Sequence, residues 1–237
     1  MRTILRLILW DVDGTLVLAG PAAREAFDAA VRAVVGRDPG PHGVQMTGKT
    51  DPQIALEILA TMAVSERDAA EHLPGIMRAL ETQLEAAVGA LRRGGRALTG
   101  ARALLARLGA EPSILQTVLS GNVEANARLK LRVFGLDRWM EFECGAYGSD
   151  HHDRNELVPI VLEKIERRHG VRVDPAKVWV IGDTPLDLAC ARAGGARCLL
   201  VGTGRIPLAE LREAEPDALF PDLADTAAVI RLLTSED

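Results

Sequence analysis

The sequence predicts an α/β fold: a doubly wound, Rossmann-like parallel sheet core with an all-helical cap domain inserted after the first strand. Short apolar runs fit strands that are buried on both faces of a parallel sheet. Most of these runs are followed by small or polar residues and then by a helical pattern, which is the chain order of a doubly wound sheet. A long Ala-rich segment between the first two runs carries helical patterns instead.

The apolar runs place strands at residues 4–10, 113–119, 142–147, 177–181 and 198–201, of which 142–147 is the weakest. Helical patterns follow three of them, in NVEANARLKLRVFG, ELVPIVLEKIERRHG and TPLDLACARAGG. Each of these segments repeats apolar residues at helical spacing and stops at glycine, a common helix end. Strand, loop and helix therefore alternate through the second half of the chain.

The insertion covers roughly residues 21–91 and contains AAREAFDAAVRAVVG, DPQIALEILATMA and SERDAAEHLPGIMRALETQLEAAVGAL, with no evident strand. Two linkers would join it to the sheet, the second being the Gly-rich RRGGR at residues 92–96. We expect an α/β core domain of residues 1–18 and 95–237 and a helical cap domain of residues 19–94.

Composition, charge and cysteine spacing disfavour several classes of protein. The 237 residues are 48% hydrophobic, enough to bury a core, and the net charge of -5 without blocks of like charge disfavours nucleic acid or an anionic membrane as partner. The N-terminal apolar run is interrupted by Arg6 and ended by Asp11, too short for a signal peptide. Three cysteines without CxxC spacing disfavour a disulfide framework or a zinc site. We expect a cytoplasmic protein that acts on a small molecule.

Ligands of open α/β sheets bind at the carboxyl ends of the strands. The first such turn is DVDGTL at residues 11–16. Asp11 and Asp13 are two residues apart, so their side chains would face the same way. Gly14 lets the backbone leave the strand at an angle that a β-carbon would hinder. Two carboxylates are thus expected at the mouth of a buried strand.

Two further turns add polar groups. LSGN at 119–122 offers the Ser120 hydroxyl and the free backbone N–H groups of a helix start, although a serine there is often only a helix cap. VIGDTPLD at 180–187 supplies Asp183 and, four residues on, Asp187. Four carboxylates at one sheet edge favour Mg²⁺, a hard cation. The alternative is that the last two acids cap or solubilise the helix.

These motifs resemble those of the haloacid dehalogenase superfamily of hydrolases. DVDGTL is similar to its first motif, VLSGN to its second and VWVIGDTPLDLACARAGGA to its fourth, in the same order. The resemblance spans nearly the whole chain, and the insertion lies where the phosphoglycolate phosphatase-like branch has its helical cap.

The resemblance implies a Mg²⁺-dependent phosphatase for a small phosphorylated metabolite, a phosphoglycolate- or sugar-phosphate-like monoester. Asp11 would attack phosphorus and carry an aspartyl-phosphate, and Asp13 would act as general acid and base. Mg²⁺ would be bound by Asp11, Asp183 and the backbone carbonyl of Asp13, with Asp187 orienting metal-bound water. The phosphate would be held by Ser120, Gly121 and Asn122.

The third motif of that family is a cation before a helix, usually lysine. In GSDHHDRNELVP, residues 148–159, the position is held by Arg154, whose guanidinium can grip phosphate in a bidentate fork. Lys130 is a rival for this role. Adjacent histidines on a strand or helix point apart and no third ligand lies at a recognisable spacing, so His151 and His152 are expected in a solvated loop, where a substrate contact stays open.

In the insertion, TGKTD at residues 47–51 resembles the loop that family members lower over the phosphate, with Lys49 and Thr50 as candidate substrate contacts. Asp51 precedes a proline at a helix start and would cap that helix.

Other functions would place different requirements on these residues. A metal-independent haloacid dehalogenase would have an apolar or aromatic residue in place of Asp13, and a phosphonatase, which uses a cap lysine near Lys49, typically lacks that second acid. A phosphomutase would keep Asp13 and stays open. A phospho-accepting receiver module has about half this length and no helical insertion.

Overall fold

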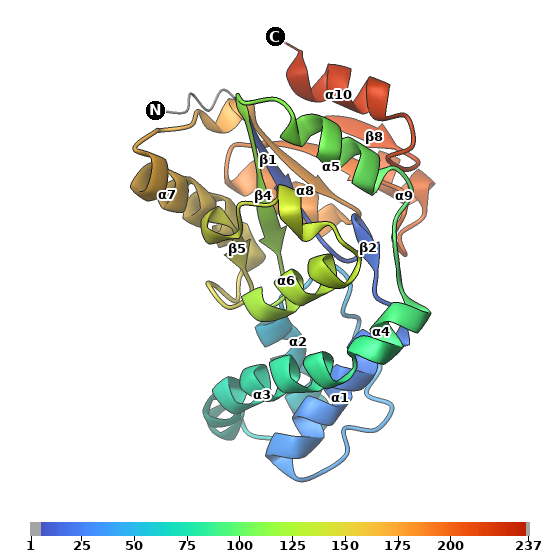
Figure 1. Ribbon diagram of the computed structural model, residues 1–237. Coiled ribbons are helices and arrows are strands. Elements are labelled where there is room, and N and C mark those ends of the chain that lie inside the picture. The colour runs from blue at the N-terminus through green and yellow to red at the C-terminus, as the bar shows by residue number, and fades with distance from the viewer. Residues whose placement is uncertain (1–5, 236–237) are drawn as a thin grey trace.

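The computed structural model describes residues 6–235 and contains a six-stranded parallel sheet in the order β5-β4-β1-β6-β7-β8 (Figure 1). The first strand, β1, lies in the middle of the sheet, which extends to one side through β4 and β5 and to the other side through β6, β7 and β8. This is the predicted doubly wound α/β fold. The strands of this sheet are β1 Arg6–Trp10, β4 Ile114–Ser120, β5 Ala146–Tyr147, β6 Val178–Gly182, β7 Arg197–Val201 and β8 Ala218–Phe220.

The predicted strands are present, with differences at their ends. Residues 4 and 5 of the first predicted strand lie outside the described residues. Of the weak run at 142–147 only β5 is a strand, because residues 142–144 form the 3₁₀ turn η2 (Phe142–Cys144). The edge strand β8 was not predicted, since three half-buried residues give no periodic apolar pattern.

Helices cover both faces of the sheet, which makes three layers. Alternating side chains of β1 divide between them: Ile8 and Trp10 pack with α5, α6 and α10, whereas Leu7 and Leu9 pack with α7, α8 and α9. The bounds are α5 Ala101–Gly109, α6 Glu124–Val133, α7 Leu157–His169, α8 Pro185–Ala193, α9 Leu208–Glu213 and α10 Thr226–Thr234, with 3₁₀ turns η1 Asp137–Trp139, η3 Arg154–Glu156 and η4 Pro175–Lys177.

The insertion after the first strand is helical, and no strand interrupts residues 21–91, all of which the structure describes. Its helices share an apolar cluster that includes Phe27, Ile58, Ile76 and Leu80 and is separate from the two clusters of the sheet. In Figure 1 they lie together beyond one end of the sheet. The bounds are α1 Pro21–Val35, α2 Asp51–Thr61, α3 Glu66–Ala86 and α4 Val88–Gly94.

The two chain segments that lead into and out of the insertion pair with each other. Short strands β2 (Val17–Leu18) and β3 (Arg96–Ala97) run antiparallel. The predicted Gly-rich linker at 92–96 is therefore wrong in detail, because residues 92–94 are the last turn of α4 and residue 96 is in β3. The exact division into two domains stays a prediction.

Across residues 6–235, none of the helices has both the length and the apolar character needed to cross a bilayer.

Candidate active site

The carboxyl ends of β1, β4 and β6 open into a cavity of about 710 Å³ between the sheet and the helical insertion. The lining on the sheet side includes Asp11, Asp13, Ser120, Arg154 and Asp183. Parallel strands end at the same edge, so residues from three distant sequence motifs meet there. The lining from the insertion is both charged and apolar.

Asp11 directly follows β1 and is buried, with 6% of its surface exposed. The Arg154 Nη2 donates to its Oδ1 at 3.0 Å, and the Ser120 hydroxyl donates to the same oxygen at 3.4 Å. Burial raises the pKa of Asp11, the carboxylate of Asp187 raises it further, and the guanidinium of Arg154 opposes the shift. Asp11 is therefore a carboxylate that depends on neighbouring positive charge to stay ionised.

Asp183 follows β6, and its carboxylate lies against Asp11. One oxygen each from Asp11, Asp183 and Asp187 fall within 4.8 Å of one another, and all three residues are buried. Burial, followed by the charge of Asp11, raises the pKa of Asp183. Three buried carboxylates beside one guanidinium carry excess negative charge in a set of hard oxygen donors, and this fits Mg²⁺.

The backbone closes tightly around Asp183. A β-carbon added at Gly204 would lie 1.6 Å from the Asp183 Oδ2, and one added at Gly14 would lie 2.4 Å from it, where φ is also +90°. Glycine is thus required at both positions for the carboxylate to keep its place. The Thr203 hydroxyl donates to the carbonyl of Gly14 at 2.6 Å and ties these two loops together.

Asp187 caps the start of helix α8, which was one of the two alternatives, and it also belongs to the acidic cluster. Its Oδ2 accepts from the backbone N–H of Asp183 (3.2 Å) and from the N–H (3.0 Å) and hydroxyl (2.7 Å) of Thr184, in a capping box at the start of α8. Its Oδ1 pairs with Arg154. Both oxygens of Asp187 are therefore engaged within the protein, and the metal roles of Asp11, Asp13, Asp183 and Asp187 stay predictions.

The two candidate cations contact different acids. Arg154 is buried and bridges Asp11 and Asp187 through Nη2. Lys130, from α6, contacts instead Asp13 and the Asn122 side-chain carbonyl, the latter at 2.6 Å. Arg154 thus pairs with Asp11, as expected of the third motif, whereas Lys130 pairs with Asp13.

Asp13 shares the cavity with Asp11 but bonds to other groups. Its side chain is 38% exposed, and Oδ2 accepts from the Asn122 amide at 2.9 Å as well as from Lys130. The Asn122 amide also donates to the Ser120 hydroxyl at 2.8 Å. A chain of polar contacts therefore runs from Asp13 through Asn122 and Ser120 to Asp11.

The loop before α2 reaches over this edge of the sheet. Lys49 lines the cavity and pairs with Glu57 at 2.5 Å. Thr50 is fully buried: its hydroxyl donates to the carbonyl of His152 at 2.6 Å and accepts from the backbone N–H of Gln53 at 3.3 Å. Thr50 therefore does not join the cavity lining, in contrast to the predicted substrate contact.

The prediction that Asp51 caps α2 is wrong, because Thr50 is the cap. The Asp51 carboxylate instead accepts from the backbone N–H of Val123 at 2.8 Å, and its own N–H donates to the carbonyl of Gly121 at 2.7 Å. Burial raises the pKa of Asp51 to about 6, although Lys130 opposes the shift. Asp51 thus fastens the loop to the second motif.

The two histidines behave differently from the expectation that their side chains point apart. Their rings stack, with centroids 4.7 Å apart, because the loop at 151–152 is neither strand nor helix. Neither histidine is among the residues that line the cavity, and the backbone of His152 accepts the Thr50 hydrogen bond.

Sequence reasoning missed the loop after β7. Thr203, Gly204 and Arg205 line the cavity, together with Arg24 from α1. The rule that was applied to the other strands, to inspect the residues just past each strand, would have found the first three. The same rule could not have found Arg24, because Arg24 lies within helix α1 of the insertion and does not follow a strand.

Solved structures share this fold over almost the whole chain. A hydrolase from Pseudomonas syringae has a TM-score of 0.70 at 18% identity, covering 97% of this chain and 100% of that one. CbbY from Rhodobacter sphaeroides, solved in complex with phosphate, has a TM-score of 0.67 at 20% identity, covering 94% and 96%. At these identities the likeness concerns the fold.

Sequence comparison gives the family. A protein of Caldanaerobacter subterraneus subsp. tengcongensis, named as a candidate pyrophosphatase, PpaX, is 27% identical over 128 residues, which span 54% of this chain and only 56% of that protein. The family model described as haloacid dehalogenase-like hydrolase matches residues 8–192, which is well over half of the chain and includes the first three motif regions and the fourth up to residue 192. The chain therefore belongs to the haloacid dehalogenase-like hydrolase family.

Proposed function

We propose that this protein is a Mg²⁺-dependent phosphatase that hydrolyses a small phosphomonoester through an aspartyl-phosphate on Asp11. The observation that carries the proposal is the setting of Asp11 at the end of β1. It is a buried carboxylate that faces a permanent cation, Arg154, and a second buried carboxylate, Asp183, at the base of a cavity. A nucleophilic carboxylate needs this exclusion of water and this local positive charge.

In the first step, a carboxylate oxygen of Asp11 forms a bond to phosphorus and the bond from phosphorus to the ester oxygen breaks. Arg154 and Ser120 hold the attacking carboxylate in place through its Oδ1. The departing alkoxide takes a proton from Asp13, which lies in the same cavity. The substrate alcohol leaves and the phosphoryl group stays on Asp11.

In the second step, water attacks phosphorus, Asp13 takes a proton from that water, and the bond to the Asp11 oxygen breaks to release phosphate. Asn122 and Lys130 hold Asp13 for both proton transfers. Asp11 and Asp183 would hold Mg²⁺, which supplies positive charge against the repulsion between carboxylate and phosphate.

The cavity supports a substrate larger than phosphate alone. Arg24, Lys49 and Arg205 bring positive charge to its lining, and Phe27 and Leu84 bring apolar surface. Such a mixture suits a phosphorylated metabolite with a polar, partly apolar carbon skeleton, in line with a phosphoglycolate- or sugar-phosphate-like ester. The relative that was solved with phosphate supports phosphate as the shared group.

The alternatives differ in what they require of the same residues. A metal-independent dehalogenase has no use for the pairing of Asp13 with Lys130 or for Asp183. A phosphomutase would use every residue named above, and it would depend on a bisphosphate activator. We therefore include the activator in the test.

The test measures release of inorganic phosphate from a panel of small phosphomonoesters, with and without Mg²⁺, for the wild type and Asp11→Asn. Asp38→Asn is a matched control, because Asp38 lies on the surface in an ion pair with Arg32. We expect metal-dependent turnover that Asp11→Asn abolishes and Asp38→Asn retains. Absence of phosphate from every ester with a folded wild type would refute the phosphatase, and turnover only with a bisphosphate would indicate a mutase.

We also propose a cytoplasmic location without a nucleic-acid or membrane partner. The three cysteines are free and buried, which suits a reducing compartment, and the net charge of the chain is negative.

A further inference from the structure

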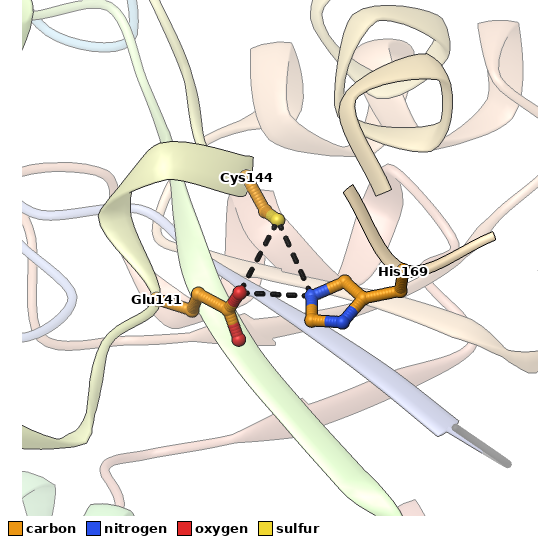
Figure 2. Close-up of side chains that lie close together, drawn as sticks. All are labelled: Glu141, Cys144 and His169. Carbon is orange, nitrogen blue, oxygen red and sulfur yellow. Dashed lines mark hydrogen bonds and ion pairs between the residues drawn. The ribbon is translucent and has the colours of Figure 1, made fainter. Parts of the chain in front are cut away.

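Three side chains of different chemistry meet outside the catalytic cavity: Glu141, Cys144 and His169 (Figure 2). Glu141 immediately precedes η2, Cys144 ends η2, and His169 is the last residue of α7. The Glu141 Oε1 lies 2.8 Å from the His169 Nε2, and the Cys144 Sγ lies 3.7 Å from each of these atoms. Figure 2 shows the three polar atoms at the corners of a small triangle.

This arrangement is not a nucleophilic triad. In a catalytic triad the imidazole contacts the nucleophile through one ring nitrogen and the acid through the other. Here the same nitrogen, Nε2 of His169, faces both the sulfur and the carboxylate oxygen. No proton can therefore be relayed across the ring from Cys144 to Glu141. Three ligand atoms that face one common point are instead the geometry of a metal site.

Two of the three separations are close to those around a tetrahedral zinc ion, and the third has to widen. With Zn–S near 2.3 Å and Zn–N and Zn–O near 2.1 Å, a tetrahedron has sulfur edges of about 3.6 Å and a nitrogen-to-oxygen edge of about 3.4 Å. The two sulfur edges in the structure are 3.7 Å. The nitrogen-to-oxygen edge is 2.8 Å and has to open by about 0.6 Å, which a rotation of the Glu141 carboxylate can supply.

We propose that Glu141, Cys144 and His169 form a binding site for Zn²⁺, with water as the fourth ligand. A thiolate and a carboxylate balance the two charges of the ion, and the set of one sulfur, one nitrogen and one oxygen selects a borderline-soft metal rather than Mg²⁺. Cys144 is fully buried, while Glu141 and His169 are each about one-fifth exposed and give the ion access from solvent.

The surroundings of the site hold its ligands in place. The Arg168 Nε donates to the Glu141 Oε1 at 2.8 Å, a contact with a ligating carboxylate of the kind found around metal sites. The backbone N–H of Glu141 donates to the carbonyl of Gln116 at 2.9 Å, and the Thr117 hydroxyl donates to the carbonyl of Glu141 at 2.7 Å. A bound ion would therefore fasten the end of α7 to the segment that runs beside β4.

The site is distinct from the proposed catalytic metal. Its anchors on β4, Gln116 and Thr117, lie four and three residues before Ser120, which faces the cavity. At about 3.3 Å per residue along a strand, the two places are separated by roughly 10–13 Å along β4 alone. Zinc here would therefore stabilise the fold without taking part in phosphoryl transfer.

The test uses the full chain, stripped with a chelator and saturated with Mg²⁺, and titrates it with Co²⁺ as a spectroscopic substitute for Zn²⁺. We expect one equivalent to produce a sulfur-to-cobalt charge-transfer band and the intense visible absorption of a tetrahedral site, and Zn²⁺ to displace it. Cys144→Ser should abolish the charge-transfer band. Cys198→Ser is the matched control, because Cys198 is equally buried in β7, and it should retain the band.

A second measurement follows Zn²⁺ affinity and thermal unfolding. His169→Ala and Glu141→Gln should weaken Zn²⁺ binding by at least 10- to 100-fold, because loss even of a residue that only orients a metal ligand costs about this much, while His151→Ala should not. Zn²⁺ should raise the unfolding midpoint of the wild type and not that of His169→Ala, so the test stands even if Cys144→Ser does not fold. Absence of a charge-transfer band in the wild type, or Zn²⁺ affinity unchanged by His169→Ala, would show a hydrogen-bonded cluster only and overturn the proposal.

Discussion

Replacement of Arg154 by methionine tests how the acidic cluster is balanced. The guanidinium is 7% exposed and lies between the carboxylates of Asp11 and Asp187. Loss of one member of a buried ion pair costs about 3–5 kcal/mol, because the remaining charges are left without compensation in a medium that solvates them poorly. The cost should stay within this range, since Asp187 keeps its three hydrogen bonds from residues 183 and 184.

The expected cost of Arg154→Met depends on pH and on metal. A protonated Asp11 needs no cationic partner, and burial already raises its pKa, so the loss should be smaller at pH 6 than at pH 8. Mg²⁺ should recover part of the loss, because it brings positive charge to the same carboxylates. Urea unfolding at both pH values, with EDTA or with Mg²⁺, measures all four conditions.

Lys130→Met is the matched comparison. Lys130 pairs with Asp13, which is 38% exposed and can turn to solvent, so its loss should cost less than that of Arg154. We expect Arg154→Met to slow phosphorylation of Asp11 by roughly 100-fold or more, with partial recovery in Arg154→Lys. Two results would refute the reasoning: an Arg154→Met protein as stable as wild type at pH 8 without Mg²⁺, or Asp11 phosphorylation that Lys130→Met slows and Arg154→Met leaves unchanged.

Three further predictions concern the same edge of the sheet. The folded pKa of Asp51, about 6, lies above its unfolded value, so Asp51 favours the folded state below about pH 4 and this contribution is lost as the pH rises through 6. In Asp51→Asn, whose side chain can still accept from Val123, the decline in unfolding free energy between pH 4 and 7 should be smaller by up to about 3 kcal/mol. Parallel curves of unfolding free energy against pH for the two proteins would contradict this. Gly204→Ala would place a β-carbon 1.6 Å from the Asp183 carboxylate and displace it. Calorimetric titration should therefore show a Mg²⁺ affinity at least tenfold lower than that of the wild type. An unchanged affinity would mean that Asp183 is not a ligand. The pKa values of Asp11 and Asp183 are raised, so protons bound to these carboxylates compete with the metal. Apparent Mg²⁺ affinity should therefore rise by about tenfold per pH unit for each proton that the metal displaces. A Mg²⁺ affinity independent of pH between 6 and 8 would exclude such competition.

The sheet was predictable because its central strands are buried on both faces and are therefore continuous apolar runs. β1, β4, β6 and β7 were found within one or two residues of their ends within the described chain. β8 and the pair β2 and β3 were not, because strands of two or three partly exposed residues are defined by their partners rather than by their own composition.

The site was predictable where function follows from position on a strand. Asp11, Ser120 and Asp183 meet because parallel strands end together, and a sequence motif records that position. The partners of these residues were harder to assign. Whether Arg154 or Lys130 pairs with Asp11 depends on where a 3₁₀ turn and a helix direct two long side chains, and both positions are compatible with the sequence pattern.

The proposed zinc site shows the same limit more sharply. Cys144 and His169 are 25 residues apart, Cys144 before α7 and His169 at its last position, so no ligand spacing of the CxxC kind relates them. Their approach is set by the length of α7, which returns its last residue to the turn that precedes β5. A spacing rule can only find sites whose ligands share one local element. The absence of such a spacing therefore gave no reason to exclude a metal, and only the tertiary contact brings the site into view.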